Sequence, residues 1–464
     1  MIPKANPSEN TPRFSYRGFM LDTVRHFSTV EDILRILDQM AALKLNVFHW
    51  HLANDQGYRL ESRRFKKLNE VASFRNLDEL DPLVEKGLCQ AGERYGGFYT
   101  FEQVRQVTSY AADRGITVVP EIEMPGHAAA ILAAYPELSC DGRETTVAAT
   151  FGIHDRVFCA GNEAVYKFLE ALLDEVCDLF DSPWIHIGGD EAPKDAWHSC
   201  PKCQQLMRQR NFRSHERLQS HFTNRIISHL KTKGKTAIVW NESAYDGTLD
   251  PEAIVQYWME MAPGESYMPK EFPMGRKLIL SNQNPFYCDY SYAETPLRAT
   301  LQYEPQVKDV PVPPENVLGI EATLWTEWLP TAEDREKMIW PRLLAFAECA
   351  WTKERDTEDF LERAKQYLHS NASFLTAMPW EQANPQGDDA LRQIAQNMLA
   401  LSARHARMAA KEGRTVRANV HEDAEPVDPQ VQVFEYMKEK MLPAYTEADV
   451  KKVLYFLSQM RNEH

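Results

Sequence analysis

Eight short apolar segments alternate with helical patterns between residues 15 and 350, and this alternation constrains the fold more than any other feature. The predicted strands are residues 17–22, 45–52, 117–124, 184–190, 236–242, 253–258, 277–282 and 318–327. Helical periodicity follows the first strand (29–44) and precedes the fourth (162–180). Strands that alternate with helices form parallel sheets, and eight such units predict a closed (β/α)8 TIM barrel of the α/β class.

The chain changes character after about residue 356. Residues 357–370, 390–410 and 433–460 have the pattern of helices with polar faces, without strand signals between them. We therefore predict a lead-in (1–12), a catalytic barrel (13–355) and an α-helical C-terminal region (356–464).

Charge and hydropathy narrow the classes of partner. A net charge of −15 and a pI near 5.5 argue against nucleic acid or an anionic membrane as the main partner. No segment approaches 18 consecutive apolar residues, so we expect no transmembrane helix. The start, MIPKANPSEN, lacks the apolar core of a signal peptide. We expect a cytoplasmic monomer or homodimer, unless a signal has been trimmed from a secreted or periplasmic protein.

Polar and aromatic side chains gather where the predicted strands end. They are Asp22, His51, Glu123, Asp190, Glu242, Trp258, Asn282 and Glu327. Barrel enzymes build their active sites at the carboxyl ends of their strands, so this pattern places an active site there.

The stretch WIHIGGDEAP (184–193) ends an apolar strand with two glycines and then two adjacent carboxylates, Asp190 and Glu191. Close carboxylates push each other's protonation apart, so one stays ionised while the other can hold a proton near neutral pH. Glycosidic bond cleavage needs such a pair. The alternative interpretation is an acidic N-cap of the helix that follows.

Five ordered motifs carry a family resemblance. They are YRGFMLDTVRHF, LNVFHWHLANDQGYRLE, VVPEIEMPGHA, HIGGDEAPKDAW and GIEATLWTEW followed by WPRLLAFAECAW. Over roughly residues 13–355 the chain resembles family 20 glycoside hydrolases, the β-N-acetylhexosaminidases. The resemblance implies exo-acting, retaining release of terminal β-linked GlcNAc or GalNAc from oligosaccharides or glycoconjugates, without cofactor or metal. A lacto-N-biosidase-like member is the alternative within the family.

The resemblance also implies roles for the reacting groups. The substrate's own 2-acetamido oxygen attacks C1 and gives an oxazolinium ion, an exception to the two-carboxylate scheme. Glu191 is expected to act as general acid and then base, and Asp190 to accept the acetamido N–H. Tyr287 is expected to hydrogen-bond the acetamido oxygen, while Asp55 and His127 orient the acid/base.

Sugar-binding residues are expected around this centre. Trp240, Trp258 and Trp325 end three strands and could wall an acetamido pocket, because indole faces stack on pyranose rings. By resemblance, Arg17 would bind sugar hydroxyls, while Asp289 and Glu327 would bind the outer hydroxyls. Arg17 starts its strand whereas Arg25 follows the end of it, so Arg25 is the alternative.

Two other functions, a metal-dependent hydrolase and a non-catalytic sugar-binding barrel, are the alternatives. His49 and His51 lie on one face of a strand and, with His127, His186 and Asp190, could belong to a metal-dependent hydrolase. The metal-dependent hypothesis gives no role to the tryptophans or Glu191, and loss of activity in a chelator would support it. A non-catalytic sugar-binding barrel would not need both carboxylates.

The cysteines suggest structure rather than catalysis. Cys200 and Cys203 form one CxxC pair, which supplies at most half a zinc site, and no second CxxC is present. We expect a structural turn there. Cys140 and Cys159 flank a loop and could form a disulfide in an oxidising compartment.

Overall fold

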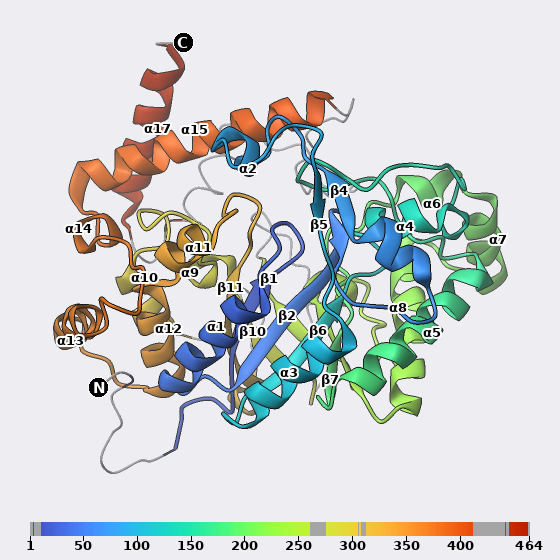
Figure 1. Ribbon diagram of the computed structural model, residues 1–464, viewed down its shortest axis with the longest axis horizontal. Helices are drawn as coiled ribbons and strands as arrows, with labels where there is room; N and C mark the ends of the chain where they lie inside the picture. The colour runs from blue at the N-terminus through green and yellow to red at the C-terminus, as the bar shows by residue number, and fades with distance from the viewer. Residues whose placement is uncertain are drawn as a thin grey trace.

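A closed barrel of eight parallel strands forms the centre of the chain (Figure 1). The computed structural model describes residues 3, 11–259, 275–304, 306–307, 312–411, 441 and 445–462. The barrel strands are β1 (Tyr16–Asp22), β2 (Val47–Asn54), β6 (Thr117–Ile122), β7 (Trp184–His186), β8 (Thr236–Trp240), β9 (Ile254–Tyr257), β10 (Leu278–Leu280) and β11 (Val317–Leu324). They follow one another in sequence order around the barrel, and β1 closes it by pairing with both β2 and β11. The (β/α)8 prediction is confirmed.

Three short strands lie in the connection between β2 and β6. β3 (Gly57–Tyr58) pairs antiparallel with β2, and β4 (Phe74–Asn76) pairs antiparallel with β5 (Arg94–Gly96). These strands were not expected from the sequence, because two or three residues are too few to show a period.

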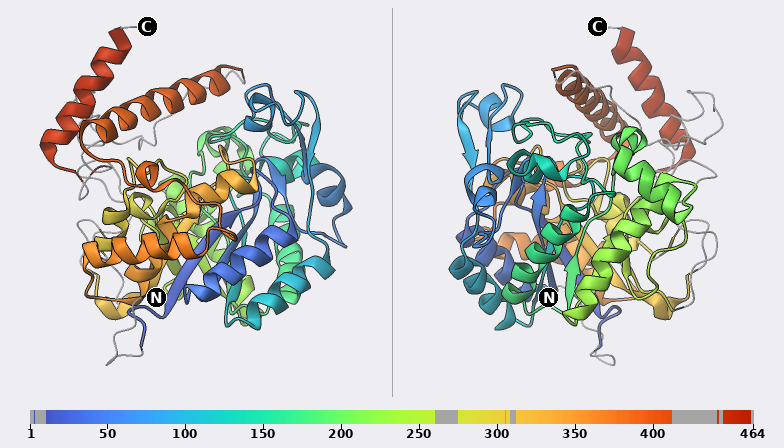
Figure 2. Two further views of the ribbon diagram at one scale, coloured as in Figure 1. Left: turned by 60° about the vertical axis from the view of Figure 1, so that its left-hand side comes forward. Right: turned by 90° about the vertical axis from the view of Figure 1, so that its right-hand side faces the viewer.

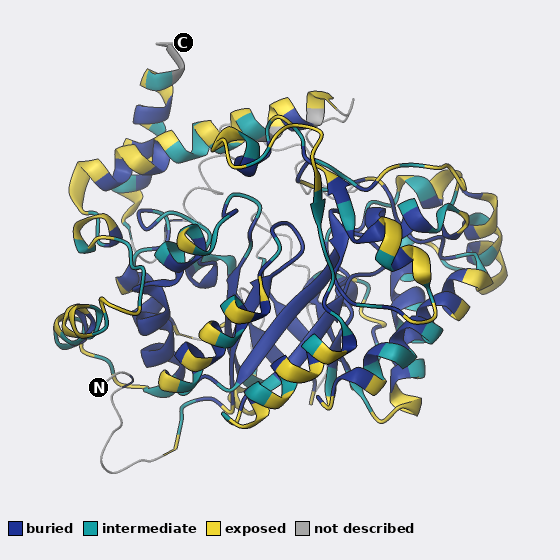
Figure 3. Ribbon diagram, viewed as in Figure 1, coloured by how far each residue is buried: buried dark blue, intermediate teal, exposed yellow. Residues whose placement is uncertain are grey.

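Helices surround the barrel (Figure 3). Side-chain caps fix the start of several of them. Thr29 and Asp32 form a capping box on α1 (Val30–Ala42), and Thr100 and Gln103 form one on α3 (Phe101–Ala112). The other helices of the barrel region are α2 (Pro82–Glu85), α4 (Ala129–Ala134), α5 (Glu163–Leu179), α6 (Asp195–Ser199), α7 (Pro201–Arg210), α8 (His215–Thr232), α9 (Gln283–Phe286), α10 (Leu297–Gln302), α11 (Ala332–Ile339) and α12 (Arg342–Trp351). Short turns are η1 (Leu68–Ala72), η2 (Pro136–Leu138), η3 (Asn241–Ala244) and η4 (Pro314–Asn316).

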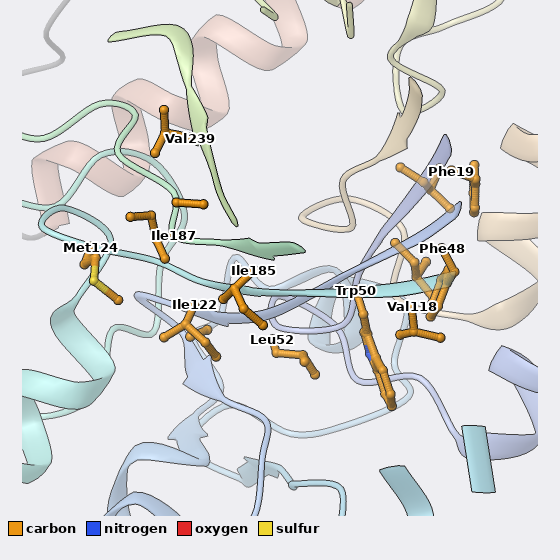
Figure 4. Close-up of a cluster of buried hydrophobic side chains, with 14 of the residues drawn as sticks. Phe19, Phe48, Trp50, Leu52, Val118, Ile122, Met124, Ile185, Ile187 and Val239 are labelled. Carbon is orange, nitrogen blue, oxygen red and sulfur yellow. The ribbon is translucent and has the colours of Figure 1, made fainter. Parts of the chain in front are cut away.

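Alternation along β2 divides the core into two layers. Phe48, Trp50 and Leu52 belong to the large apolar cluster between strands and helices (Figure 4). His49 and His51 point the other way, into the barrel, where they contact buried glutamates. Apolar residues such as Val47 fill the barrel interior nearer the amino ends of the strands.

The barrel interior above that apolar layer is polar, and its histidines lie against buried carboxylates. His49 Nδ1 lies 2.8 Å from Glu321 Oε1, and its Nε2 lies 3.2 Å from Glu121 Oε2. Burial lowers the pKa of His49, but the two carboxylates outweigh this and raise it to about 10. His51 also contacts Glu121. Both histidines of the HWH motif thus contact buried glutamates inside the barrel.

The C-terminal region is helical, as predicted, in its described part. It contains α13 (Thr357–Ser370), α14 (Trp380–Ala383), α15 (Gly387–Lys411) and α17 (Glu447–Asn462), while residues 433–440 and 442–444 of the third predicted helix lie outside the described residues. α15 and α17 pack together through a separate apolar cluster, and both views of Figure 2 place them together at one end of the molecule. Arg404 of α15 lies over the Trp328 ring at 4.6 Å, in the connection that follows β11. Within the described residues, no helix combines the length and hydropathy needed to cross a membrane.

Candidate active site

Two glycines turn the chain out of the barrel after β7. Gly188 and Gly189 have φ angles of 65° and 106°, which L side chains rarely adopt. A Cβ at Gly188 would lie 1.7 Å from Glu123 Oε2, and one at Gly189 would lie 2.0 Å from Ser243 Oγ. The turn therefore requires glycine for both conformation and space, and it delivers Asp190 and Glu191 to one side. Glu191 itself is held at φ 44°, an uncommon conformation that occurs often at functional sites.

His127 joins the two carboxylates. Its Nε2 lies 3.5 Å from Asp190 Oδ2 and 3.4 Å from Glu191 Oε2. Its Nδ1 lies 2.8 Å from Asp55 Oδ2, and Asp55 also accepts the Ala129 N–H at 3.0 Å. The structure thus brings four predicted residues into one chain of contacts, from buried Asp55 through His127 to the adjacent pair.

The electrostatics of this chain favour an ionised Asp190. Burial lowers the pKa of His127, yet Asp190, Asp55 and Glu191 together raise it well above its usual range. Conversely, burial raises the pKa of Asp190, but the charge and hydrogen bond of His127 hold it below its usual range. A protonated imidazole and an anionic Asp190 therefore stabilise each other.

Two further glutamates surround Asp190, and sequence reasoning gave them no role. Burial and the Asp190 charge raise the pKa of Glu123 well above its usual range and that of Glu242 to about 8. Gly189 N–H donates to Glu123 at 3.3 Å, and the Trp258 indole donates to Glu242 at 2.9 Å. Protonation of these two acids leaves the local negative charge on Asp190. Their one sequence signal was their place at the end of a barrel strand.

The predicted aromatic wall is assembled beside the carboxylates. Trp240, Trp258 and Tyr287 form one buried cluster, with Trp325 and Tyr290 packed against it. The rings of Trp258 and Tyr287 are 6.1 Å apart and nearly parallel, and Trp325 lies 6.2 Å from both Trp240 and Tyr287. Burial raises the pKa of Tyr287 well above its usual range, so its hydroxyl keeps a proton to donate.

A charged group borders this wall. Arg25 lies over the Trp325 ring at 5.2 Å, and one of its guanidinium nitrogens is 3.6 Å from Glu327 Oε1. The backbone N–H of Trp325 donates to Asp289 Oδ1 at 3.5 Å. Burial, followed by the charge of Glu327, raises the pKa of Asp289 to about 8. Arg25, Asp289 and Glu327 therefore offer donors and acceptors suited to hydroxyl groups.

The preference for Arg17 as the sugar-binding arginine is wrong. Its guanidinium donates to the backbone carbonyls of Lys44 at 2.8 Å and Phe14 at 2.7 Å, and it lies 5.0 Å over the Trp351 ring. Arg17 belongs to the amino end of β1, and five residue-to-residue steps of extended strand, about 16 Å, separate it from Asp22 at the other end. Its side chain binds the loops at the amino ends of the strands, and Arg25 lies in the candidate site instead.

The sequence and fold of the chain were compared with those of known proteins. Residues 14–354 match the family model described as glycosyl hydrolase family 20, catalytic domain. The chain belongs to glycosyl hydrolase family 20. A family 20 structure, an exo β-N-acetylglucosaminidase from Vibrio harveyi in complex with N-acetylglucosamine, aligns with a TM-score of 0.68 and 31% identity, covering 80% of this chain and 60% of that one.

Relatives with similar sequences are named β-hexosaminidases. A β-hexosaminidase from Porphyromonas gingivalis is 40% identical over 381 residues, which are 78% of this chain and 47% of the relative. The human β-hexosaminidase subunit beta is 31% identical over 365 residues, with 77% of this chain and 61% of the subunit covered. This family 20 chain thus spans about half the length of the Porphyromonas relative.

Proposed function

We propose that the chain is an exo-acting β-N-acetylhexosaminidase that releases terminal β-linked GlcNAc or GalNAc with retention of configuration. The observation that carries the proposal is the contact of one histidine, His127, with both Asp190 and Glu191 beside an aromatic wall. Family membership and the names of the relatives support the same activity.

In the proposed reaction the substrate supplies the nucleophile. The 2-acetamido oxygen attacks C1 while Glu191 gives a proton to the leaving oxygen, which breaks the glycosidic bond and forms an oxazolinium ion. Glu191 then takes a proton from water, the water oxygen bonds to C1 and the ring opens to the acetamide. Two displacements at C1 return the original configuration.

Asp190 and Tyr287 serve the acetamido group. Anionic Asp190 accepts the acetamido N–H and offsets the positive charge that develops on the ring, and its low pKa suits that role. The Tyr287 hydroxyl keeps its proton and donates to the acetamido oxygen. Glu191, with 23% of its side chain exposed, faces the departing group and is positioned by His127 and Asp55.

The remaining residues hold the sugar. Trp240, Trp258 and Trp325 wall the acetamido side, while Arg25, Asp289 and Glu327 bind the hydroxyls of the terminal residue. A pocket that binds the outer hydroxyls accepts only a chain end, and this gives the exo action. The predicted cytoplasmic location and the oligomeric state, monomer or homodimer, stay proposals.

The decisive experiment changes the substrate rather than the enzyme. Nitrophenyl β-N-acetylglucosaminide and nitrophenyl β-N-acetylgalactosaminide should be hydrolysed, while the matched β-glucoside, with a 2-hydroxyl, should be turned over negligibly. A stable thiazoline analogue of the oxazolinium ion should bind about 10²-fold or more tightly than N-acetylglucosamine. Efficient hydrolysis of the glucoside, or a sugar trapped covalently on a carboxylate, refutes the mechanism. Hydrolysis of a nitrophenyl lacto-N-bioside alone would instead favour the lacto-N-biosidase alternative.

A further inference from the structure

Four cysteines converge outside the proposed active site. The Sγ of Cys159 lies 3.6 Å from that of Cys200 and 3.7 Å from that of Cys203, and Cys140 Sγ lies 3.9 Å from Cys203 Sγ. All four sulfur atoms lie within 4.8 Å of one another. The expectation of an isolated CxxC pair is therefore wrong, because the fold brings two cysteines from an earlier loop to it.

The separations match one tetrahedral metal ion. A disulfide bond is about 2.05 Å long, which is far shorter than these contacts. Four sulfurs bound to zinc at about 2.3 Å form a tetrahedron with edges of about 3.8 Å. The observed values of 3.6, 3.7 and 3.9 Å surround that edge length.

The local backbone suits deprotonated sulfurs. Cys200 is the N-cap of the ten-residue helix α7 and Cys203 lies in its first turn, where free backbone N–H groups favour negative charge. A Cβ at Gly161 would lie 2.5 Å from Cys203 N, so glycine lets the loop that carries Cys159 approach the start of the helix.

We propose that Cys140, Cys159, Cys200 and Cys203 bind one structural Zn²⁺ ion in a closed tetrahedral site. Four thiolates select zinc over hard cations such as Mg²⁺ and Ca²⁺, which prefer oxygen ligands. Four protein ligands leave no open position for a substrate or water, so the ion has a structural role. Binding releases the protons that the thiols carry.

The site braces the two loops that carry the proposed acid/base machinery. Cys140 and Cys159 belong to the connection from β6 to α5, in which Phe158 N–H donates to Pro125 O at 3.0 Å, two residues before His127. Cys200 and Cys203 follow Glu191 along the chain, and the intervening Trp197 indole donates to Phe158 O at 2.9 Å. A Cβ at Gly126 would lie 3.0 Å from Ala192 Cα, so the two loops also touch beside His127 and Glu191.

Metal analysis of the full chain tests the proposal without relying on activity. Protein purified without chelator and dialysed against metal-free buffer should contain one zinc per chain by elemental mass spectrometry. Cys203→Ser should lose that zinc, whereas Cys89→Ser, a cysteine outside the cluster, should keep it. Reconstitution of the zinc-depleted chain with Co²⁺ should give the intense sulfur-to-cobalt charge-transfer bands of a tetrahedral thiolate site.

Stability supplies a second readout. A strong chelator should lower the melting temperature of the wild type and Cys89→Ser by several degrees, and added zinc should restore it, because a ligand that binds only the folded state stabilises it. A wild type that binds no zinc refutes the proposal, whether its four thiols are free or peptide mapping finds disulfides among them. Bound iron in place of zinc refutes the metal assignment. These outcomes do not depend on glycosidase activity, so this proposal and the proposed function fail separately.

Discussion

Replacing Arg25 should damage catalysis, whereas replacing Arg17 should damage only stability. Arg17 lies near the start of β1 and Arg25 follows its end, and both are almost equally buried, at 8% and 6% exposure, so burial alone does not distinguish them. Arg25 contacts Glu327 and lies over Trp325 in the site. The Arg17 guanidinium instead donates to backbone carbonyls and lies over the Trp351 ring.

The contacts give the sizes of both effects. A hydrogen bond to a charged group contributes about 1.5–3 kcal/mol, so losing the hydrogen bonds that we propose Arg25 makes to sugar hydroxyls should cost about 3 kcal/mol, which is about 10²-fold in kcat/KM. Arg17→Ala leaves the part-buried Lys44 carbonyl and the buried Phe14 carbonyl short of a donor and should reduce the free energy of unfolding by about 1–3 kcal/mol. Its kcat/KM should stay within about twofold.

Steady-state hydrolysis of nitrophenyl β-N-acetylglucosaminide and urea unfolding of each variant measure the two effects. Arg25→Ala also leaves the Asp22 and Glu327 carboxylates without their cation, so Arg25→Lys is the second variant. Lysine keeps the charge but not the planar fork, and it should recover stability while kcat/KM stays low. A folded Arg17→Ala that loses more kcat/KM than Arg25→Lys would show that the assignment is wrong.

Three further predictions concern the carboxyl groups of the site. Glu191→Gln should lose about 10² to 10⁴-fold in turnover of oligosaccharides but less on nitrophenyl substrates, whose leaving group needs little proton donation; equal losses on both would count against its role as the acid. Asp190→Asn should be severely impaired on both substrate types alike, and a leaving-group dependence like that of Glu191→Gln would contradict its action on the nucleophile. Burial, more than any other cause, raises the pKa of Glu242 from 4.5 to about 8, so the folded state holds this proton more tightly than the unfolded state. Its contribution to the free energy of unfolding is therefore complete below about pH 4.5 and is lost as the pH rises through about 8. Urea unfolding across this range should show a smaller decline in Glu242→Gln than in the wild type, and identical slopes would contradict the assignment.

The sequence by itself determined the barrel and the end of it that carries the site. A local apolar run predicts each of the eight strands, and a period of about 3.6 residues predicts the helices between them. The end of each strand is also local information, and this was enough to place Asp190, Glu191 and Trp258 on one rim. Prediction succeeded here because strand, helix and turn preferences act over a few neighbouring residues.

Only the tertiary structure decided which side chains meet across long stretches of chain. Arg17 and Arg25 are eight positions apart, yet one reaches backbone carbonyls and the other the site, because strand direction separates the ends of β1. The raised pKa of Glu242 depends first on burial and then on the charge of Asp190, which lies in the turn after β7, whereas Glu242 lies in η3 after β8. Cys140 and Cys159 join Cys200 and Cys203 across a spacing without a recognisable period, because the loop after β6 folds back on α7. Such contacts depend on how distant loops pack against one another, and the preferences of neighbouring residues for strand, helix or turn do not determine that packing.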